Sequence, residues 1–190
     1  FVLFALVERD CEGLLVLPTH RLVSGLAGSF SLDALREAAG FAWQRVDSAG
    51  ADLSDADAFL ADYGLGAMAF VAGDGADLWI GRLTDPRAMA AAAPDHCQAW
   101  RELDVAILQT LIMDGALEAF KTAETAVTYT PDGTEALSAV RSGKAQLAVI
   151  MQGTPAAAVE AVALAGEVMP HKSTYFYPKL STGMVLKPLA

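Results

Sequence analysis

AVTYTPDGTEALSAVRSGKAQLAVIMQGTPAAAVEAVALAG, residues 126–166, is the stretch that indicates the fold class most directly. Residues 126–130 contain β-branched and aromatic side chains, and residues 146–151 form a short apolar run. Segments of this length and composition predict β-strands. Each is followed by a longer segment rich in alanine, leucine and valine, which predicts a helix. The stretch therefore predicts a strand–helix–strand–helix unit, with a right-handed crossover if the two strands are parallel.

Capping signals set the limits of these two helices. Asp132 and Glu135 form the D-x-x-E pattern of a helix N-terminus, and Gly143 is placed to end that helix. Pro155 begins the second helix, because its fixed φ suits a helix start, and Gly166 ends it. Both helices are therefore predicted to begin and end at residues that are favoured at helix termini.

Two hairpins are predicted in the first half of the chain. FVLFALVE (residues 1–8) and LLVLP (residues 14–18) are separated by a polar turn, and residues 66–73 and 76–83 flank an Asp-Gly turn. FAWQRV, residues 41–46, predicts a further strand.

Helices are predicted between these strands. Ser31 and Ser54 are placed to cap helices that begin there, and Pro86 opens a third. The longest helix is predicted from His96 to Leu117. Its apolar stripe consists of Val105, Leu108, Leu111 and Ile112.

Together these elements predict an α+β (or α/β) fold. We expect a mixed sheet with two hairpins, a long central helix and the C-terminal strand–helix–strand–helix unit. No internal repeat or linker divides the chain, so residues 1–190 are predicted to be a single C-terminal domain or a fragment of a longer protein. The abrupt start at Phe1, without a basic leader, fits a fragment.

The composition indicates a globular cytoplasmic protein. Of 190 residues, 54% are hydrophobic and 19% are charged, which is enough for one ordinary core. No apolar run approaches the roughly 20 residues that cross a bilayer, so no membrane contact is expected. Cys11 and Cys97 are too few for a disulfide framework, and we expect reduced thiols.

Charge is distributed unevenly. The formal net charge of −10 argues against nucleic acid as a partner. Residues 169–190 nevertheless hold three lysines and no acid, which leaves 10 of the 13 basic and all 23 acidic side chains to the rest of the chain. A basic end segment on an acidic body suggests a local anion site. The alternative is that these lysines pair with acidic neighbours.

The end segment MPHKSTYFYPKLSTG, residues 169–183, is the strongest candidate for a binding site. Its aromatic and β-branched residues predict an extended chain, whose side chains alternate between two faces. One face carries Ser173, Tyr175, Tyr177 and Lys179. Hydroxyl donors, rings and an ammonium group on one face suit an anionic ligand with a flat or sugar-like part, while Phe176 would anchor the other face in the core. The alternative is an edge strand with amphipathic side chains.

Lys172 opens this segment and is the charged group best placed to meet an anion. The N-terminus of the helix that begins at Pro155 would add free N–H groups and a positive dipole end.

PTHR, residues 18–21, is a second compact polar group at the end of a predicted strand. His20 could act as an acid or base near neutral pH, and Arg21 could hold a carboxylate or phosphate. The alternative is a structural turn. No glycine-rich phosphate loop, paired-cysteine zinc motif or nucleophile elbow occurs in the sequence, so no metal is predicted and the cofactor is left open.

Several of these motifs together resemble the bacterial and archaeal family catalogued as domain of unknown function 1015. The resemblance rests on GLLVLPTHRLV, WRELDVAILQTLI, YTPDGTEALSAV and MPHKSTYFYPKLSTG, in that order and over nearly the whole chain. His171 stands where the family commonly has a small residue or proline, and Lys187 where asparagine is frequent. Neither departure affects the Lys–Ser–Thr–Tyr core.

The resemblance implies that this chain is the C-terminal half of a bacterial protein. The family's upstream half looks related to the ParB/sulfiredoxin-like group, which includes nucleotide-using enzymes and a free-serine kinase. The family supplies no settled activity.

Two functions remain open from the sequence. In the first, this half and its missing N-terminal half bind a small anionic or phosphorylated ligand. The expected lining residues are His20, Arg21, Lys172, Ser173, Tyr175 and Lys179. Phosphoryl transfer would be the reaction if the protein is an enzyme, with the acid and base in the missing half. PTHR and KSTYFYPK should then approach a common cleft.

The alternative is a noncatalytic interaction or dimerisation domain, whose possible partners are the other half of the protein or a second copy of the chain.

Overall fold

We analysed a computed structural model, which describes residues 8, 13–38, 40–47, 51–73, 77–179 and 183. Apart from Glu8, the predicted strand over residues 1–8 lies outside the described residues, as do Cys11 and the closing MVLKPL segment. The strands are β1 (Leu15–Leu17), β2 (His20–Ser24), β3 (Phe41–Asp47), β4 (Met68–Ala72), β5 (Asp77–Leu83), β6 (Ala126–Thr130), β7 (Leu147–Ile150) and β8 (Tyr175–Tyr177). The helices are α1 (Leu32–Ala38), α2 (Ala56–Ala61), α3 (Arg87–Ala92), α4 (Gln98–Arg101), α5 (Asp104–Ile107), the π-helical η1 (Leu108–Ala116), the 3₁₀ turn η2 (Glu118–Phe120), α6 (Gly133–Arg141) and α7 (Ala156–Leu164).

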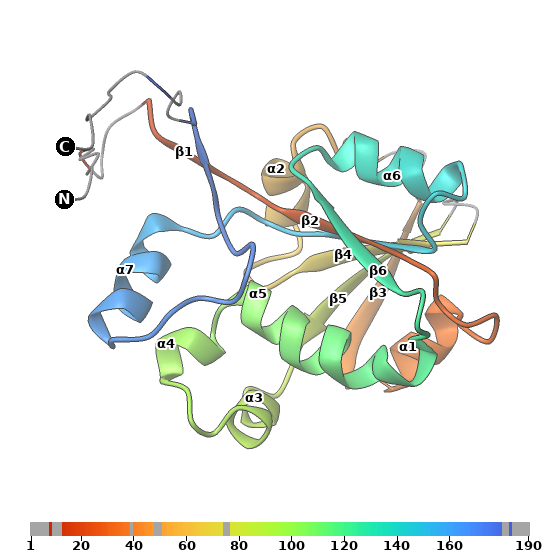
Figure 1. The fold of residues 1–190 in the computed structure, drawn as a ribbon, viewed down its shortest axis with the longest axis horizontal. Helices are drawn as coiled ribbons and strands as arrows, with labels where there is room; N and C mark the ends of the chain where they lie inside the picture. Colours follow the sequence, from red (N-terminus) through yellow and green to blue (C-terminus); the bar gives the residue numbers. More distant parts are fainter. Residues whose placement is uncertain are drawn as a thin grey trace, which may run out of the picture.

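The fold is α+β, as predicted, and is built on a six-stranded sheet with the order β3-β5-β4-β7-β2-β6. Helices α2 and α6 cover one face, while α1, α3, α4 and α5 cover the other (Figure 1). The predicted β4–β5 hairpin is confirmed by antiparallel pairing from Met68 opposite Gly81 to Val71 opposite Leu78.

Side-chain alternation along the central strands creates the two cores. In β4, Met68 and Phe70 pack with the α1, α3 and α5 side, whereas Ala69 and Val71 pack with α2 and α6. β7 alternates in the same way. Because both strands are covered on both faces, they read as unbroken apolar runs in the sequence.

The prediction of a mixed sheet was wrong for the described strands. Every hydrogen-bonded pair of neighbours in the six-stranded sheet is antiparallel. Strands β6 and β7 do run in the same direction, but β2 lies between them, with Val23 opposite Val127 on one side and Leu147 on the other. The strand–helix–strand unit is therefore present without a parallel ladder.

The predicted long helix is interrupted. Leu103 is extended, with φ −67° and ψ 129°, so α4 ends at Arg101 and a new helix begins at Asp104. That second helix continues through η1, and its buried stripe includes Val105, Leu108 and Ile112, as predicted. Leu103 itself is only 4% exposed, so burial of this side chain accompanies the break.

Helix caps agree with the sequence at two places and differ at a third. The Ser31 hydroxyl accepts from Ala34 N at 3.1 Å, and the Asp132 carboxylate accepts from Thr134 N and Glu135 N at 2.8 and 3.1 Å. At α2 the cap is Asp55 and not Ser54. Asp55 accepts from the amide of residue 58 at 2.9 Å, because the Ser54 hydroxyl is engaged by Asp52.

The end segment forms a separate two-stranded ribbon in which β8 pairs antiparallel with β1. It projects from the main sheet on the side of α7 (Figure 1). The expectation that Phe176 anchors the core was wrong, because this side chain is 37% exposed. A two-stranded ribbon has no second layer of its own to bury it, and Tyr177 is 50% exposed beside it.

Candidate functional site

Arg21 is the centre of the candidate site. It lies on β2 and is 3% exposed. Its Nη1 donates to the carbonyl of Thr19 and contacts Met151 Sδ at 3.0 Å, and its Nη2 donates to the carbonyl of Lys172 at 3.3 Å. The two predicted segments therefore meet, since this last bond joins PTHR to KSTYFYPK.

Tyr129 on β6 lies opposite Arg21 in the sheet and completes the contact. The guanidinium carbon of Arg21 lies 5.8 Å from the centre of the Tyr129 ring, and Lys172 Nζ lies 6.0 Å from the same centre. The edge-on His171 ring is 6.2 Å away. Because Tyr129 is 38% exposed and Lys172 is exposed, this cluster opens to solvent above a buried guanidinium.

The charge of Arg21 is not balanced by a carboxylate among the described residues, where it forms no ion pair. Burial lowers its pKa from 12.5 to about 10, opposed by Tyr129, so the group stays charged at neutral pH. A buried cation whose acceptors among the described residues are carbonyl and thioether groups projects a positive potential toward the exposed ring.

His20 was expected to line the site, and the structure corrects this. The side chain is 0% exposed, and its Nδ1 accepts from Met151 N at 3.2 Å. Its Nε2 has no hydrogen-bond partner within the described part of the chain. Burial lowers the pKa of His20 to about 4, helped by Arg21 and opposed by Asp132, so His20 is neutral at pH 7 and is enclosed within the fold.

Ser173 also has a structural position. It is 6% exposed, and its hydroxyl donates to the carbonyl of Pro170. Its own carbonyl accepts from the Thr154 hydroxyl at 3.1 Å, which ties the start of α7 to the end segment. Between these bonds Lys172 adopts φ +59°, a left-handed conformation that is uncommon for a residue with a side chain. This turn aims the Lys172 carbonyl at Arg21.

Tyr175 and Lys179 form a separate pair on the ribbon. Lys179 Nζ lies 4.4 Å from the centre of the Tyr175 ring. Of the six predicted lining residues, the contacts join Arg21 to Lys172 and Tyr175 to Lys179. Sequence reasoning missed Tyr129, whose place opposite Arg21 depends on the β2–β6 register.

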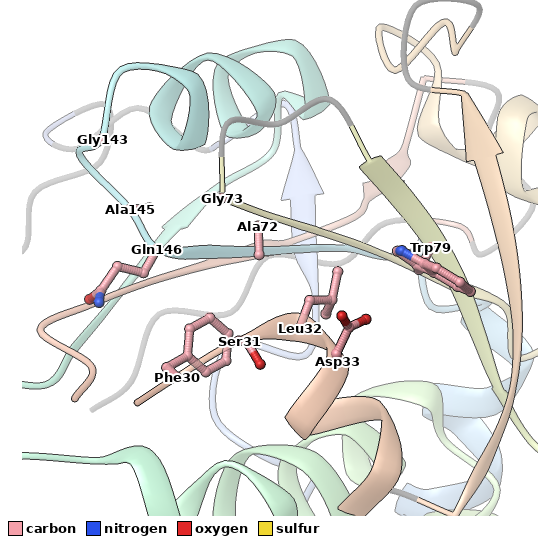
Figure 2. A pocket seen from close by; sticks show the side chains of 10 residues that line it. All are labelled: Phe30, Ser31, Leu32, Asp33, Ala72, Gly73, Trp79, Gly143, Ala145 and Gln146. Carbon is pink, nitrogen blue, oxygen red and sulfur yellow. The ribbon is translucent and has the colours of Figure 1, made fainter. Parts of the chain in front are cut away.

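A pocket of about 450 Å³ lies elsewhere, between the start of α1 and the β4–β5 side of the sheet (Figure 2). Its polar side chains already have protein partners. Gln146 bonds both the amide and the carbonyl of Leu26, and Asp33 pairs with Arg36, which stacks 3.4 Å over the Trp79 ring. None of the predicted site residues lines it, so this pocket is not the candidate site.

No helix in the described ranges is long and apolar enough to span a membrane.

No protein-family model matches this chain, and no curated protein matches it. Solved structures do. A conserved hypothetical protein from Pyrococcus furiosus is 16% identical, with a TM-score of 0.51 over 90% of this chain and 59% of that one. Two structures of a free serine kinase in complex with AMP, one of them a mutant, are 13% and 12% identical, with TM-scores of 0.49 and 0.47 over 90% of this chain and 56% of each kinase chain.

The likeness to the Pyrococcus protein shows the fold alone, and the two kinase likenesses are too distant to carry an argument. This chain spans about three fifths of the length of the solved structures that it matches.

Proposed function

We propose that this chain binds a small anionic ligand, such as a phosphate ester, at the exposed cluster of Arg21, Tyr129 and Lys172. The observation that carries the proposal is the convergence of two cations, at 5.8 and 6.0 Å, on one partly exposed tyrosine ring. The guanidinium is buried without a carboxylate partner in the described residues. A ligand anion would supply the missing negative charge.

The ligand would contact the rim and not the buried guanidinium. The ammonium group of Lys172 offers charge-assisted hydrogen bonds to an oxyanion, and the Tyr129 face offers a surface for a flat group. The buried Arg21 guanidinium would attract the anion electrostatically without direct contact, because burial weakens the screening of its charge by salt. The same features suit a phosphorylated metabolite or nucleotide better than a neutral ligand.

We further propose that the site belongs to a longer protein of the family named above, whose N-terminal half would complete it. This chain covers 59% of the Pyrococcus protein, which is compatible with such a division. Phosphoryl transfer would then be the reaction of the whole protein, because the cations of this half can stabilise phosphate charge, while the missing half would supply a catalytic acid or base. His20, buried and neutral, does not supply one.

Titration calorimetry with inorganic pyrophosphate and with AMP tests the binding site in this chain. We expect Lys172→Ala to weaken binding tenfold or more, in line with about 1.5–3 kcal/mol for a charge-assisted contact. Lys144→Ala is the matched control, since Lys144 is exposed in the turn after α6, before the end of β7 that pairs with Val23 and not with Arg21. Equal affinity of the two variants, or no binding to the unaltered chain, would reject the site.

A noncatalytic interaction or dimerisation domain is the second candidate. It is favoured by exposed apolar side chains at the ribbon and α7, where Leu15 is 48% exposed, Leu164 81% and Val168 86%. Exposed apolar groups of this kind are typical of contact surfaces. Sedimentation of the chain over a wide concentration range tests this candidate: a monomer at every concentration argues against self-association.

A further inference from the structure

Asp104 occupies a second, chemically different position. It is the first residue of α5 and lines two neighbouring pockets, of about 290 and 230 Å³. The larger one is bounded by the α4–α5 turn and by the connection from β7 to α7, including Gln152 and Thr154. A volume near 300 Å³ is at the lower end for small-molecule sites.

The carboxyl group of Asp104 is partly buried and has no hydrogen-bond or ion-pair partner within the described ranges. The other polar groups of the larger pocket are engaged: Glu102 accepts from Gln98 at 2.6 Å, Gln152 donates to the carbonyl of Gly64 at 3.3 Å, and Thr154 bonds Ser173. Burial without a partner raises the pKa of Asp104 to about 6. Among the polar side chains that line the larger pocket, Asp104 is therefore the one with no hydrogen-bond partner in the described ranges.

The charge of the larger pocket is negative. Glu102 and Asp104 line it, and no lysine or arginine among the described residues does, whereas Arg82 and Arg101 line the smaller pocket on the other side of Asp104. Apolar side chains of Leu65, Ala99 and Leu103 complete the larger pocket. The described residues contain no group of three side chains suited to hold a metal ion, so the carboxyl is not part of a metal set there.

We propose that the larger pocket binds a small organic ammonium ion, with the cation at Asp104 and an apolar stem along Leu65 and Leu103. An ammonium group would donate to the unpartnered carboxylate and relieve the cost of its burial. The site is independent of the anion cluster, because none of Arg21, Tyr129 and Lys172 lines this pocket.

The start of α7 also lines the pocket and is the feature that would favour an anion instead. Three probes that share a four-carbon chain, butylamine, butyrate and butanol, distinguish a cation site from an anion site and from an apolar site. Each is titrated into the chain while backbone amide NMR signals of the α4–α5 turn and of residues 152–154 are followed. We expect saturable shifts with butylamine at pH 7, weaker binding at pH 5, and little response to butanol. Butyrate shifting these amides more than butylamine would overturn the proposal.

Asp104→Asn keeps the shape of the side chain and removes the charge. We expect this variant to bind butylamine at least tenfold more weakly, while Asp62→Asn, an exposed control, leaves the affinity unchanged. A loss of folding is not the expected explanation, since removing a partnerless buried charge relieves a cost. Lys172→Ala should leave butylamine binding unchanged, which separates this site from the anion site. Equal affinity in Asp104→Asn and the unaltered chain would contradict the assignment.

Discussion

Arg21 and Lys172, separated by 151 positions in the sequence, are joined twice. The guanidinium donates to the Lys172 carbonyl at 3.3 Å, and both cations face the ring of Tyr129. The first contact is accepted by the carbonyl of the left-handed residue Lys172, and the second places its ammonium near a partly exposed aromatic face. These contacts bring two positive charges together, and no carboxylate among the described residues lies between them. The proposed anion site depends on this arrangement.

Replacement of Arg21 should separate binding from stability. We expect Arg21→Met, which preserves bulk, to change the free energy of unfolding by less than about 2 kcal/mol, since a buried charge is exchanged for apolar surface. The affinity for pyrophosphate should fall at least tenfold. Urea unfolding and calorimetry measure the two quantities. A loss of stability larger than about 3 kcal/mol with unchanged affinity would assign Arg21 a purely structural role.

Substitution of Tyr129 tests the ring and its hydroxyl separately. Tyr129→Phe keeps the aromatic face, so the stability should remain within about 0.5 kcal/mol of the unaltered chain. Tyr129→Leu removes the face, and we expect a loss of about 1 kcal/mol, the size of one or two exposed cation–π contacts. Urea midpoints of the two variants, measured side by side, check this. Equal midpoints would mean that the ring contributes nothing to holding Arg21 and Lys172.

Acid should destabilise the fold through His20. Its pKa is about 4 in the folded chain, whereas the pKa of an ordinary histidine is 6.5, so the unfolded chain binds the proton first as the pH falls. Stability due to the neutral imidazole is therefore complete above pH 6.5 and is lost between pH 6.5 and 4, by about 3 kcal/mol. In His20→Asn this part of the pH dependence should disappear. Urea titrations of both proteins at pH 7 and pH 4.5 measure the free energy of unfolding. An equal loss of stability between the two pH values in His20→Asn and in the unaltered chain would contradict the buried neutral imidazole.

Asp104 should act in the opposite direction over nearly the same range. Its folded pKa of about 6 exceeds the ordinary value of 3.8, so the folded chain binds this proton first. Its burial therefore costs stability above pH 6, and the cost vanishes below pH 3.8. We expect Asp104→Asn to stabilise the chain by about 2 kcal/mol at pH 7 and to have no such effect at pH 3.5. The expected gain is smaller than the pKa shift alone would give, because the side chain is partly exposed to solvent. Asp62→Asn is the control for a change of net charge.

The cap of α2 gives a local test of the backbone assignment. Asp55→Ala should cost about 1 kcal/mol, because the amide of residue 58 loses its acceptor. Ser54→Ala should cost less, since its hydroxyl bonds Asp52 and not the helix. Thermal unfolding measures both losses, and a larger loss of stability in Ser54→Ala than in Asp55→Ala would identify Ser54 as the cap.

Local chemistry made much of the fold predictable. Ser31 and Asp132 cap their helices as expected because a cap is a contact over a few residues. The break at Leu103 has no such local signal, since leucine favours helix and the break accompanies its burial in the core. The insertion of β2 between β6 and β7, which makes the sheet antiparallel, is likewise a long-range pairing that no short motif specifies.

The candidate site was predictable in part for the same reason. Two basic groups, Arg21 at the start of β2 and Lys172 in the turn before β8, could be selected from residue type alone. Tyr129 could not, because its position opposite Arg21 is set by a register between segments about 100 residues apart. Phe176 was misassigned because alternation shows which side chains share a face, but not whether anything covers that face.

The most direct test of the central claim follows the Tyr129 ring and the Lys172 ammonium by NMR while inorganic pyrophosphate is added at low salt. We predict saturable shifts at both groups, weakened as ionic strength rises, and their loss in Arg21→Met with the fold retained. Shifts confined to residues outside the cluster, or identical titrations in the unaltered chain and in Arg21→Met, would contradict an anion site at Arg21, Tyr129 and Lys172.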